Sequence, residues 1–185
     1  LIGVGSEKSA LADTQISIKE AVEAVKARIK LGTDKIIKYN ELTFTPVNVA
    51  ELISQDHLRA FEKEINALDY SVFVSHADKV FQSIVAVNNY SPASLFEAMD
   101  MIKDFCLRLL RGNNVSEEIL AEFEEALQSL YDCNYKEGML RYRYQEACRQ
   151  LFVKIVEEKQ NQNQKPIRVS EQYIHDHFSE PITLE

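Results

Sequence analysis

The chain has 185 residues, of which 45% are hydrophobic and 27% are charged, a composition typical of soluble globular proteins. Its formal net charge of −8 argues against a self-sufficient DNA-binding surface, because phosphate contacts require a basic patch. The sequence contains no apolar run of about 18 residues, the length that predicts a membrane span, and its three cysteines form no CxxC pair. We therefore expect a cytoplasmic protein that has no membrane partner.

The first segment, residues 1–44, predicts a strand, a helix and a second strand. Short apolar strands are expected at residues 1–5 and 35–39. Between them, residues 13–31 predict a helix that ends before Gly32. The apolar face of this helix is expected to hold Ile18, Ala21, Val22, Val25 and Ile29. Two strands do not make an independent sheet domain, so the segment is interpreted as the tail of a larger α/β region.

The middle of the chain, residues 45–160, predicts a helical bundle. Apolar residues at helical spacing mark five helices, at about residues 57–68, 71–87, 91–112, 116–130 and 135–158. Each has one apolar stripe, so the helices should pack as an antiparallel bundle. The fourth helix is acidic and the fifth basic, which either orients the pair or leaves two solvated faces. The predicted fold class is mainly α, a helical bundle preceded by a short α/β strand–helix–strand fragment.

A polar linker is predicted at residues 161–165, where the chain has no apolar residue to bury. The segment 166–185 then shows apolar residues at helical spacing, namely Tyr173, Ile174 and Phe178. Because proline disfavours helical geometry in the residue before it, this helix is expected to stop at Pro181. Residues 182–185 are expected to begin another helix.

This last pattern resembles the first helix, and the entry to the second, in the AraC/XylS family of helix-turn-helix transcription activators. Residues 1–44 resemble the region that precedes the DNA-binding domain in YesN-type response regulators. That resemblance rests on Ile2-Gly-Val-Gly5, on Ser17-Ile-Lys-Glu-Ala21 and on Ile36-Ile-Lys-Tyr39, in this order. Ser17-Ile18 departs from the Ser-Tyr that is usual in those proteins.

The resemblance implies a domain division and a function. Residues 1–44 would be the C-terminal tail of a degenerate GGDEF-like α/β region, 45–160 a regulatory and dimerisation region, and 166–185 the truncated start of the AraC-type domain. The chain would be the signal-transmitting region of a two-component response regulator. Its partners would be an upstream receiver domain and a cognate histidine kinase in a phosphorelay. DNA would be contacted only through the missing part of the helix-turn-helix domain.

We predict no catalytic residue, no cofactor and no metal site, and no enzymatic activity. The pair Gly3-Val-Gly5 lacks the third glycine of a dinucleotide-binding turn, so a structural turn is favoured over phosphate binding. His175 and His177 are two residues apart and would point to different faces of a helix. His57 and His76 each lie alone in a predicted helix.

Two further hypotheses concern partners and ligands. The helix at 135–158 extends its apolar surface with Met139, Tyr142 and Phe152, which favours a homodimer if those residues do not simply cover the bundle's own core. The alternative function is a small-molecule-sensing domain of a one-component regulator. Its pocket would be lined by aromatic side chains that are otherwise core residues, namely Phe73, Phe81, Phe105, Tyr142 and Tyr144.

Overall fold

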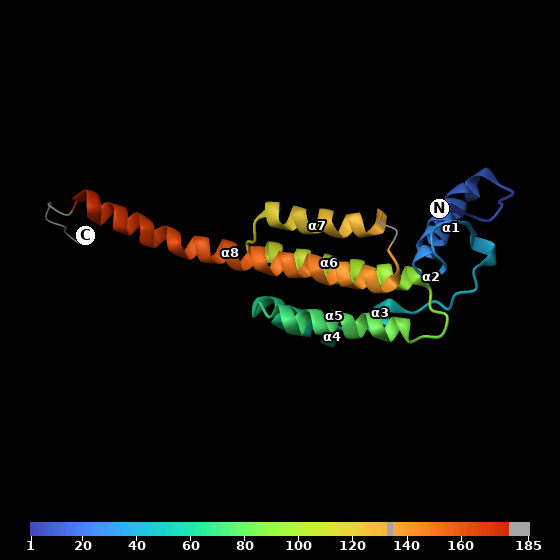
Figure 1. The fold of residues 1–185 in the computed structure, drawn as a ribbon, viewed down its shortest axis with the longest axis horizontal. Coiled ribbons are helices and arrows are strands. Elements are labelled where there is room, and N and C mark those ends of the chain that lie inside the picture. The colour runs from blue at the N-terminus through green and yellow to red at the C-terminus, as the bar shows by residue number, and fades with distance from the viewer. Residues whose placement is uncertain (133–134, 178–185) are drawn as a thin grey trace.

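The computed structural model describes residues 1–132 and 135–177, and most of them lie in helices (Figure 1). In chain order the elements are β1 (Ile2–Val4), η1 (Leu11–Asp13), α1 (Thr14–Lys26), α2 (Arg28–Leu31), β2 (Ile36–Lys38), η2 (Tyr39–Glu41), α3 (Val49–Leu52), α4 (Gln55–Asn66), α5 (Tyr70–Val85), α6 (Pro92–Gly112), α7 (Glu117–Asp132) and α8 (Glu137–His177). More than half of the chain is α-helical, which confirms the predicted mainly α fold class.

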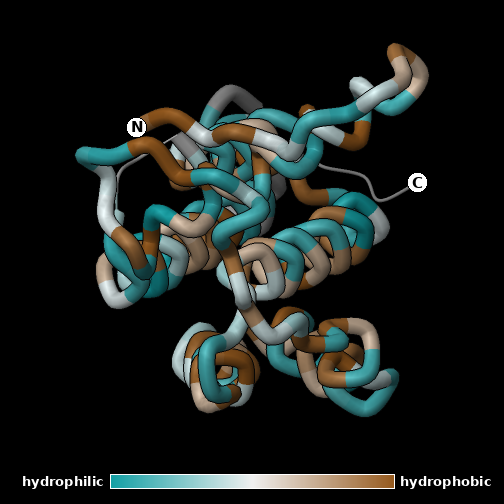
Figure 2. Tube along the Cα trace, turned by 90° about the vertical axis from the view of Figure 1, so that its right-hand side faces the viewer, coloured by the Kyte–Doolittle hydropathy of each residue, from teal (hydrophilic) through white to brown (hydrophobic). Residues whose placement is uncertain are grey.

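Helices α4 to α8 form the bundle, in which α5, α6 and α7 run alongside the first half of α8 (Figure 1). Hydrophobic and hydrophilic residues alternate around each helix seen nearly end-on in Figure 2, as expected for helices with one buried face. The proline at the first position of α6 suits a helix start, because its missing N–H has no partner there. The five bundle helices predicted from the sequence are therefore present, with ends shifted by a few residues except for the C-terminal end of α8.

The acidic α7 and the basic α8 are neighbours in the bundle. Glu122 of α7 and Lys154 of α8 form an ion pair, with 49% and 38% of their side chains exposed. At this exposure the pair contributes little to stability. Among the described residues, the predicted charge complementarity therefore takes the form of this ion pair between the two helices. Most of the contact between the helices is made by apolar side chains.

The N-terminal segment contains a two-stranded parallel sheet, with Ile2 opposite Ile36 and Gly3 opposite Ile37. Helix α1 crosses one face of this sheet at close range. A Cβ atom on Gly3 would overlap the carbonyl oxygen of Ala21, and one on Gly5 would overlap the carbonyl oxygen of Ser17. Glycine is therefore needed at both positions for packing, which supports the structural interpretation of this glycine pair.

The predicted apolar face of the helix at 13–31 is wrong in part. The helix is interrupted at Ala27, and Ile18 and Val22 are 58% and 50% exposed. The face that is buried instead holds Ala24, Ala27, Arg28 and Ile29. The small sheet packs against one side of this helix, so the residues on the other side remain exposed. The outer face of the sheet is also open, with Ile2 and Ile36 exposed at 58% and 60%.

The predicted linker at residues 161–165 lies within α8, which continues as helix to His177. Extending an existing helix gains one hydrogen bond for each residue fixed, so a polar stretch need not end it. The division of domains at this point stays a prediction, and the expected stop at Pro181 and the helix start at 182–185 lie outside the described residues. None of the described helices, α8 included, combines the length and the apolar character that a bilayer span requires.

Because its side chains are fully buried, truncating a core residue should lower the stability of the chain strongly. Ile102 is fully buried in α6, so Ile102→Ala should lower the free energy of unfolding by about 2–5 kcal/mol. Arg108→Ala, on the exposed side of the same helix, should change it by less than about 0.5 kcal/mol. Chemical denaturation monitored by circular dichroism measures both. Equal losses in the two variants would contradict the assignment of α6 to the core.

Candidate functional site

The short helix α2 fastens the N-terminal segment to the bundle through Arg28. This side chain is 4% exposed, and its guanidinium donates hydrogen bonds to the carbonyl oxygens of Val25 (3.2 Å) and Tyr131. It also lies over the ring of Phe96, 5.7 Å from the ring centroid. Tyr131 is in the last turn of α7, where backbone carbonyls lack helical partners and attract cations. Arg28 therefore connects the N-terminal segment to both α6 and α7.

A second basic residue of α2, Lys30, reaches the loop between α5 and α6. Its Nζ donates to the carbonyl oxygen of Tyr90 at 3.2 Å and lies over the Tyr90 ring, 4.3 Å from the centroid. It also lies 5.0 Å from the ring centroid of Phe44. Desolvation by burial lowers the pKa of Lys30, and Glu137 opposes this shift by charge attraction. The ammonium group thus connects α2 to Tyr90, and it is attracted by the carboxylate of Glu137 on α8.

Tyr90 in turn contacts α8. Its ring is 4% exposed, and its hydroxyl donates a hydrogen bond of 2.8 Å to Oε2 of Glu137. Burial and this hydrogen bond raise the pKa of Tyr90, so the phenol stays protonated as a donor. Glu137 is in the first turn of α8, where the helix dipole stabilises a carboxylate.

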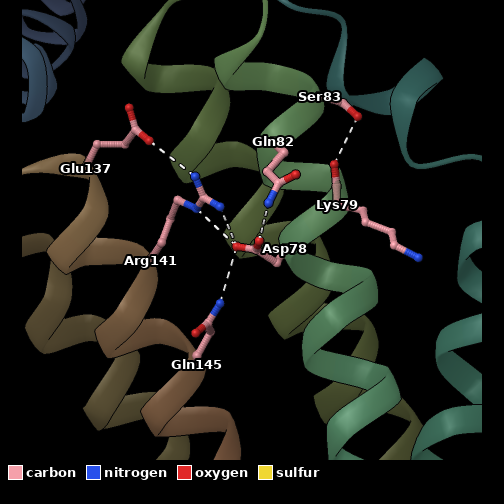
Figure 3. Close-up of polar contacts among 7 residues, drawn as sticks. All are labelled: Asp78, Lys79, Gln82, Ser83, Glu137, Arg141 and Gln145. Atoms are coloured by element: carbon pink, nitrogen blue, oxygen red, sulfur yellow. Dashed lines mark hydrogen bonds and ion pairs between the residues drawn. The ribbon is translucent and has the colours of Figure 1, made fainter.

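From Glu137 the contacts continue across α8 to α5 (Figure 3). Arg141 Nη1 lies 3.4 Å from Oε1 of Glu137, and its Nη2 and Nε lie 2.6 and 3.2 Å from Oδ1 of Asp78. The Asp78 carboxylate also accepts from the amides of Gln145 (3.3 Å) and Gln82 (2.6 Å). Only 19% of the Arg141 side chain and 21% of the Asp78 side chain are exposed, so solvent screens this pair weakly.

Together Lys30, Tyr90, Glu137, Arg141 and Asp78 form a continuous set of contacts, which we call the junction network. It links α2 to the start of α8 and to the middle of α5. Sequence reasoning missed it, because its members are up to 111 positions apart and a single charged residue in an amphipathic helix carries no pattern of its own. The only signal in the sequence was the basic character of the last bundle helix.

His57 and His76, each the single histidine of its helix, are neighbours in the fold. The rings of His57 and His76 stack with centroids 5.2 Å apart. His76 Nδ1 lies 3.0 Å from Oε1 of Glu64, and His57 Nδ1 lies 3.1 Å from Oγ of Ser54. These contacts tie α4 to α5. The described residues contain no group of three or more potential ligands that could hold a metal ion, and the side chain of His177 is outside the described ones.

The aromatic residues proposed to line a ligand pocket do not do so. Phe73, Phe81 and Tyr144 are at most 1% exposed and pack in the core, where the Phe81 and Tyr144 rings meet edge to face, 5.2 Å apart. Phe105 is packed against the same core, and Tyr142 is 57% exposed. Ring-to-ring packing fills the space that a ligand would need.

A cavity of about 540 Å³ does lie beside the junction network, between the N-terminal segment and the start of α6. Its lining includes Glu23, Tyr39, Phe44, Ser94 and Glu97. None of the five aromatic residues predicted for a pocket belongs to it. The prediction missed this cavity because its walls come from segments that are joined only by the tertiary fold.

Phe152 is also placed differently from the prediction. It was expected on a dimer face together with Met139 and Tyr142, but it is 4% exposed and packs against Tyr70 and Phe73 with centroids 5.9 and 5.3 Å apart. Met139 and Tyr142 are 47% and 57% exposed. The predicted face therefore mixed residues from two sides of α8.

Two of the cysteines, Cys106 and Cys148, are buried in the bundle as their apolar positions predicted. Desolvation raises the pKa of the Cys106 thiol to about 12 and raises that of Cys148 as well. The thiolate is the reactive form of cysteine, so neither side chain is a nucleophile near neutral pH. They act as small apolar core residues.

Comparisons of this chain with family models, with curated proteins and with solved structures find no match. The resemblance to YesN-type and AraC/XylS regulators therefore remains an inference from short motifs in the sequence. The junction network is defined by the contacts in the structure, so it does not depend on that resemblance.

The ion pair at the centre of the network predicts a measurable coupling energy. Arg141→Met should destabilise the chain by about 1–3 kcal/mol, because it leaves the shielded Asp78 carboxylate with fewer donors. Arg111→Met, which removes an exposed pair with Glu117, should cost less than about 1 kcal/mol. A double-mutant cycle with Asp78→Asn, measured by denaturant unfolding, isolates the pair. Additive effects within about 0.3 kcal/mol would show that the pair is not coupled.

Proposed function

We propose that this chain is the regulatory, signal-transmitting region of an AraC-family transcriptional regulator of the two-component response regulator type, without enzymatic activity. One observation carries the proposal. The junction network joins the N-terminal segment to the first turn of α8, and the same helix runs on into residues 166–177, which resemble the start of a helix-turn-helix domain. A continuous helix thus leads from the contact point to the DNA-reading module.

The length of α8 supports a mechanical role. Its 41 residues correspond to roughly 60 Å, so a rotation of about 5° at the first turn moves the far end by about 5 Å. The first turn is held by Tyr90 through Glu137 and by Asp78 through Arg141. A displacement of α2 would act on Lys30 and Tyr90 and would change these two attachments together. The input would come from a receiver phosphorylated by its cognate histidine kinase.

The output would be the placement of two DNA-binding modules in a homodimer. Helix-turn-helix dimers engage half-sites about 34 Å apart, so a shift of a few ångströms in module position changes which pairs of half-sites are reached. DNA would be contacted through the rest of the helix-turn-helix domain. The acidic charge of this region supports a role away from the phosphate backbone.

The test of this function is Tyr90→Phe in the intact regulator. The substitution keeps the buried ring and removes the hydrogen bond to Glu137, a loss of about 1 kcal/mol, so induced transcription from a reporter should fall about fivefold. Tyr70→Phe is the matched control, because it removes a hydroxyl that donates to the carbonyl oxygen of Gln145 within the bundle. Immunoblotting checks that protein levels are equal. Identical transcription in the two variants would reject the transmission role of the network.

A ligand-sensing role is the second candidate, and the cavity beside the junction network favours it. Its aromatic and acidic lining, Tyr39, Phe44, Glu23 and Glu97, differs from the one first predicted. A sensor should be stabilised by its ligand, so one compound of a metabolite panel should raise the melting temperature in a dose-dependent way. Ser94→Leu should then abolish the shift, since Ser94 is buried in the cavity wall. A panel without any such compound would count against the sensor.

A further inference from the structure

The cavity between the N-terminal segment and the start of α6 is built from chain segments that are fixed to one another. The N–H of Ser91 donates to the carbonyl oxygen of Thr45 at 2.7 Å, and the N–H of Thr45 donates to the carbonyl oxygen of Asn89 at 2.8 Å. Oγ of the buried Ser94 accepts from the N–H of Val47 at 3.2 Å. These bonds hold the extended segment before α3 against the turn before α6, so the cavity is preformed.

The wall of this cavity carries negative charge. Its charged side chains are Glu23 of α1 and Glu97 of α6, and no lysine, arginine or histidine of the described residues lines it. Glu23 lies 3.5 Å from Lys26, but 38% of its side chain is exposed, so this pairing is weak. Within the described part of the chain, Glu97 has no ion-pair partner. At least one carboxylate of the wall is therefore available to a ligand.

Aromatic rings form another part of the wall. Tyr39 lies in η2 and Phe44 in the extended segment after it, and both line the cavity. A cation is attracted to the face of an aromatic ring by the quadrupole of the ring. The Nζ of Lys30, 5.0 Å from the Phe44 ring centroid, makes such a contact from outside the cavity. Tyr39 is 39% exposed, so part of its ring is accessible as well.

The same wall disfavours other classes of ligand. An anion would rely on the first turn of α6, but Pro92 has no N–H there, and the N–H of Ser94 donates to the carbonyl oxygen of Ser91 at 3.0 Å. A neutral apolar ligand would desolvate two carboxylates without pairing them, which is costly. A divalent metal ion needs about six oxygen ligands, which is more than two carboxylates supply.

We propose that this cavity binds a small organic cation, a quaternary or protonated amine, between the carboxylates of Glu23 and Glu97 and the rings of Tyr39 and Phe44. The proposal rests on the second candidate function, the ligand-sensing role, and gives the chemical class of its ligand. The cavity volume of about 540 Å³ suits this class, since small-molecule sites enclose roughly 300–1,000 Å³.

A cation bound here would contact both sides of the junction. Glu23, Tyr39 and Phe44 belong to the N-terminal segment, whereas Glu97 belongs to the bundle helix α6. A ligand that contacts both sides stabilises their docked arrangement, because it binds that arrangement better than a separated one. Phe44 is also the ring over which Lys30 lies, so the cation would act on the first residue of the junction network.

Two probes of equal shape test the charge requirement. Choline is a quaternary ammonium ion, and 3,3-dimethyl-1-butanol is its neutral analogue, with a carbon atom in place of the nitrogen. In NMR titrations of the intact chain, the Kd for choline should be about tenfold lower than that for the alcohol. The amide signals that shift should be those of residues 39–47 and 91–97. Equal affinities for the two probes, or no binding of choline, would overturn the proposal.

Matched variants test the residues of the site. Glu97→Gln keeps the shape of the side chain and removes its charge, so the Kd for choline should rise about fivefold while that for the alcohol stays unchanged. Phe44→Leu should weaken choline binding to a similar degree, because it removes a ring. Glu124→Gln, at an exposed position of α7 outside the cavity, is the control and should change neither Kd.

Circular dichroism checks that the three variants stay folded. Equal effects of Glu97→Gln and Glu124→Gln on choline binding would show that choline responds only to the net charge of the chain, and this result would overturn the site.

The ligand class and the functions on which it rests fail in different ways. If choline does not bind, but another compound of the metabolite panel stabilises the chain and Ser94→Leu abolishes that effect, the sensor role stands and the ligand class is wrong. If choline binds through Glu97 but leaves transcription by the intact regulator unchanged, the site stands and the sensing role is wrong. The transmission role of the junction network is tested separately by Tyr90→Phe.

Discussion

The rest of the molecule depends on the burial of the wide apolar face of α6. This helix leaves one polar stripe exposed, which includes Glu97, Asp104 and Arg108, and buries most of the remaining side chains, including Leu95, Phe96, Met99 and Ile102. An apolar face of this width needs several partner helices to cover it. Helices α3, α4, α5 and α7 supply them in the bundle, and α1 reaches it from the N-terminal segment. Phe96 shows this directly, since it contacts Tyr131 of α7 on one hand and Arg28 of α2 on the other.

This arrangement explains why the junction lies where it does. The N-terminal segment has a buried cluster of only Ala24, Ala27 and Ile37, which is too small to hold a domain together alone. It is therefore held to the bundle by side chains of α2 that cross the boundary, namely Ile29, which packs in the bundle core, and two basic residues. Such partly buried charges add little net stability, because their desolvation offsets much of the attraction. What they provide is orientation, which is the property that a transmitting junction requires.

Periodicity in the sequence predicted the helices well, since an apolar residue every third or fourth position is a local property. It located α5 and α6 within a few residues. It failed where the outcome depends on distant parts of the chain. Phe152 could not be assigned to the inner or the outer side of α8 without knowing that Tyr70 and Phe73 lie opposite. The contact of Tyr90 with Glu137 spans 47 positions and leaves no trace in the local pattern.

The open outer face of the small sheet has a consequence for how the isolated chain behaves in solution. Parallel sheets in proteins are normally covered on both faces, whereas here Ile2 and Ile36 remain more than half exposed. Uncovered strands are templates for strand-to-strand association between molecules. The net charge of −8 opposes this by mutual repulsion, which acts over about 10 Å at 0.1 M salt and over less at higher ionic strength. We therefore expect the colloidal stability of the chain to fall as the ionic strength rises.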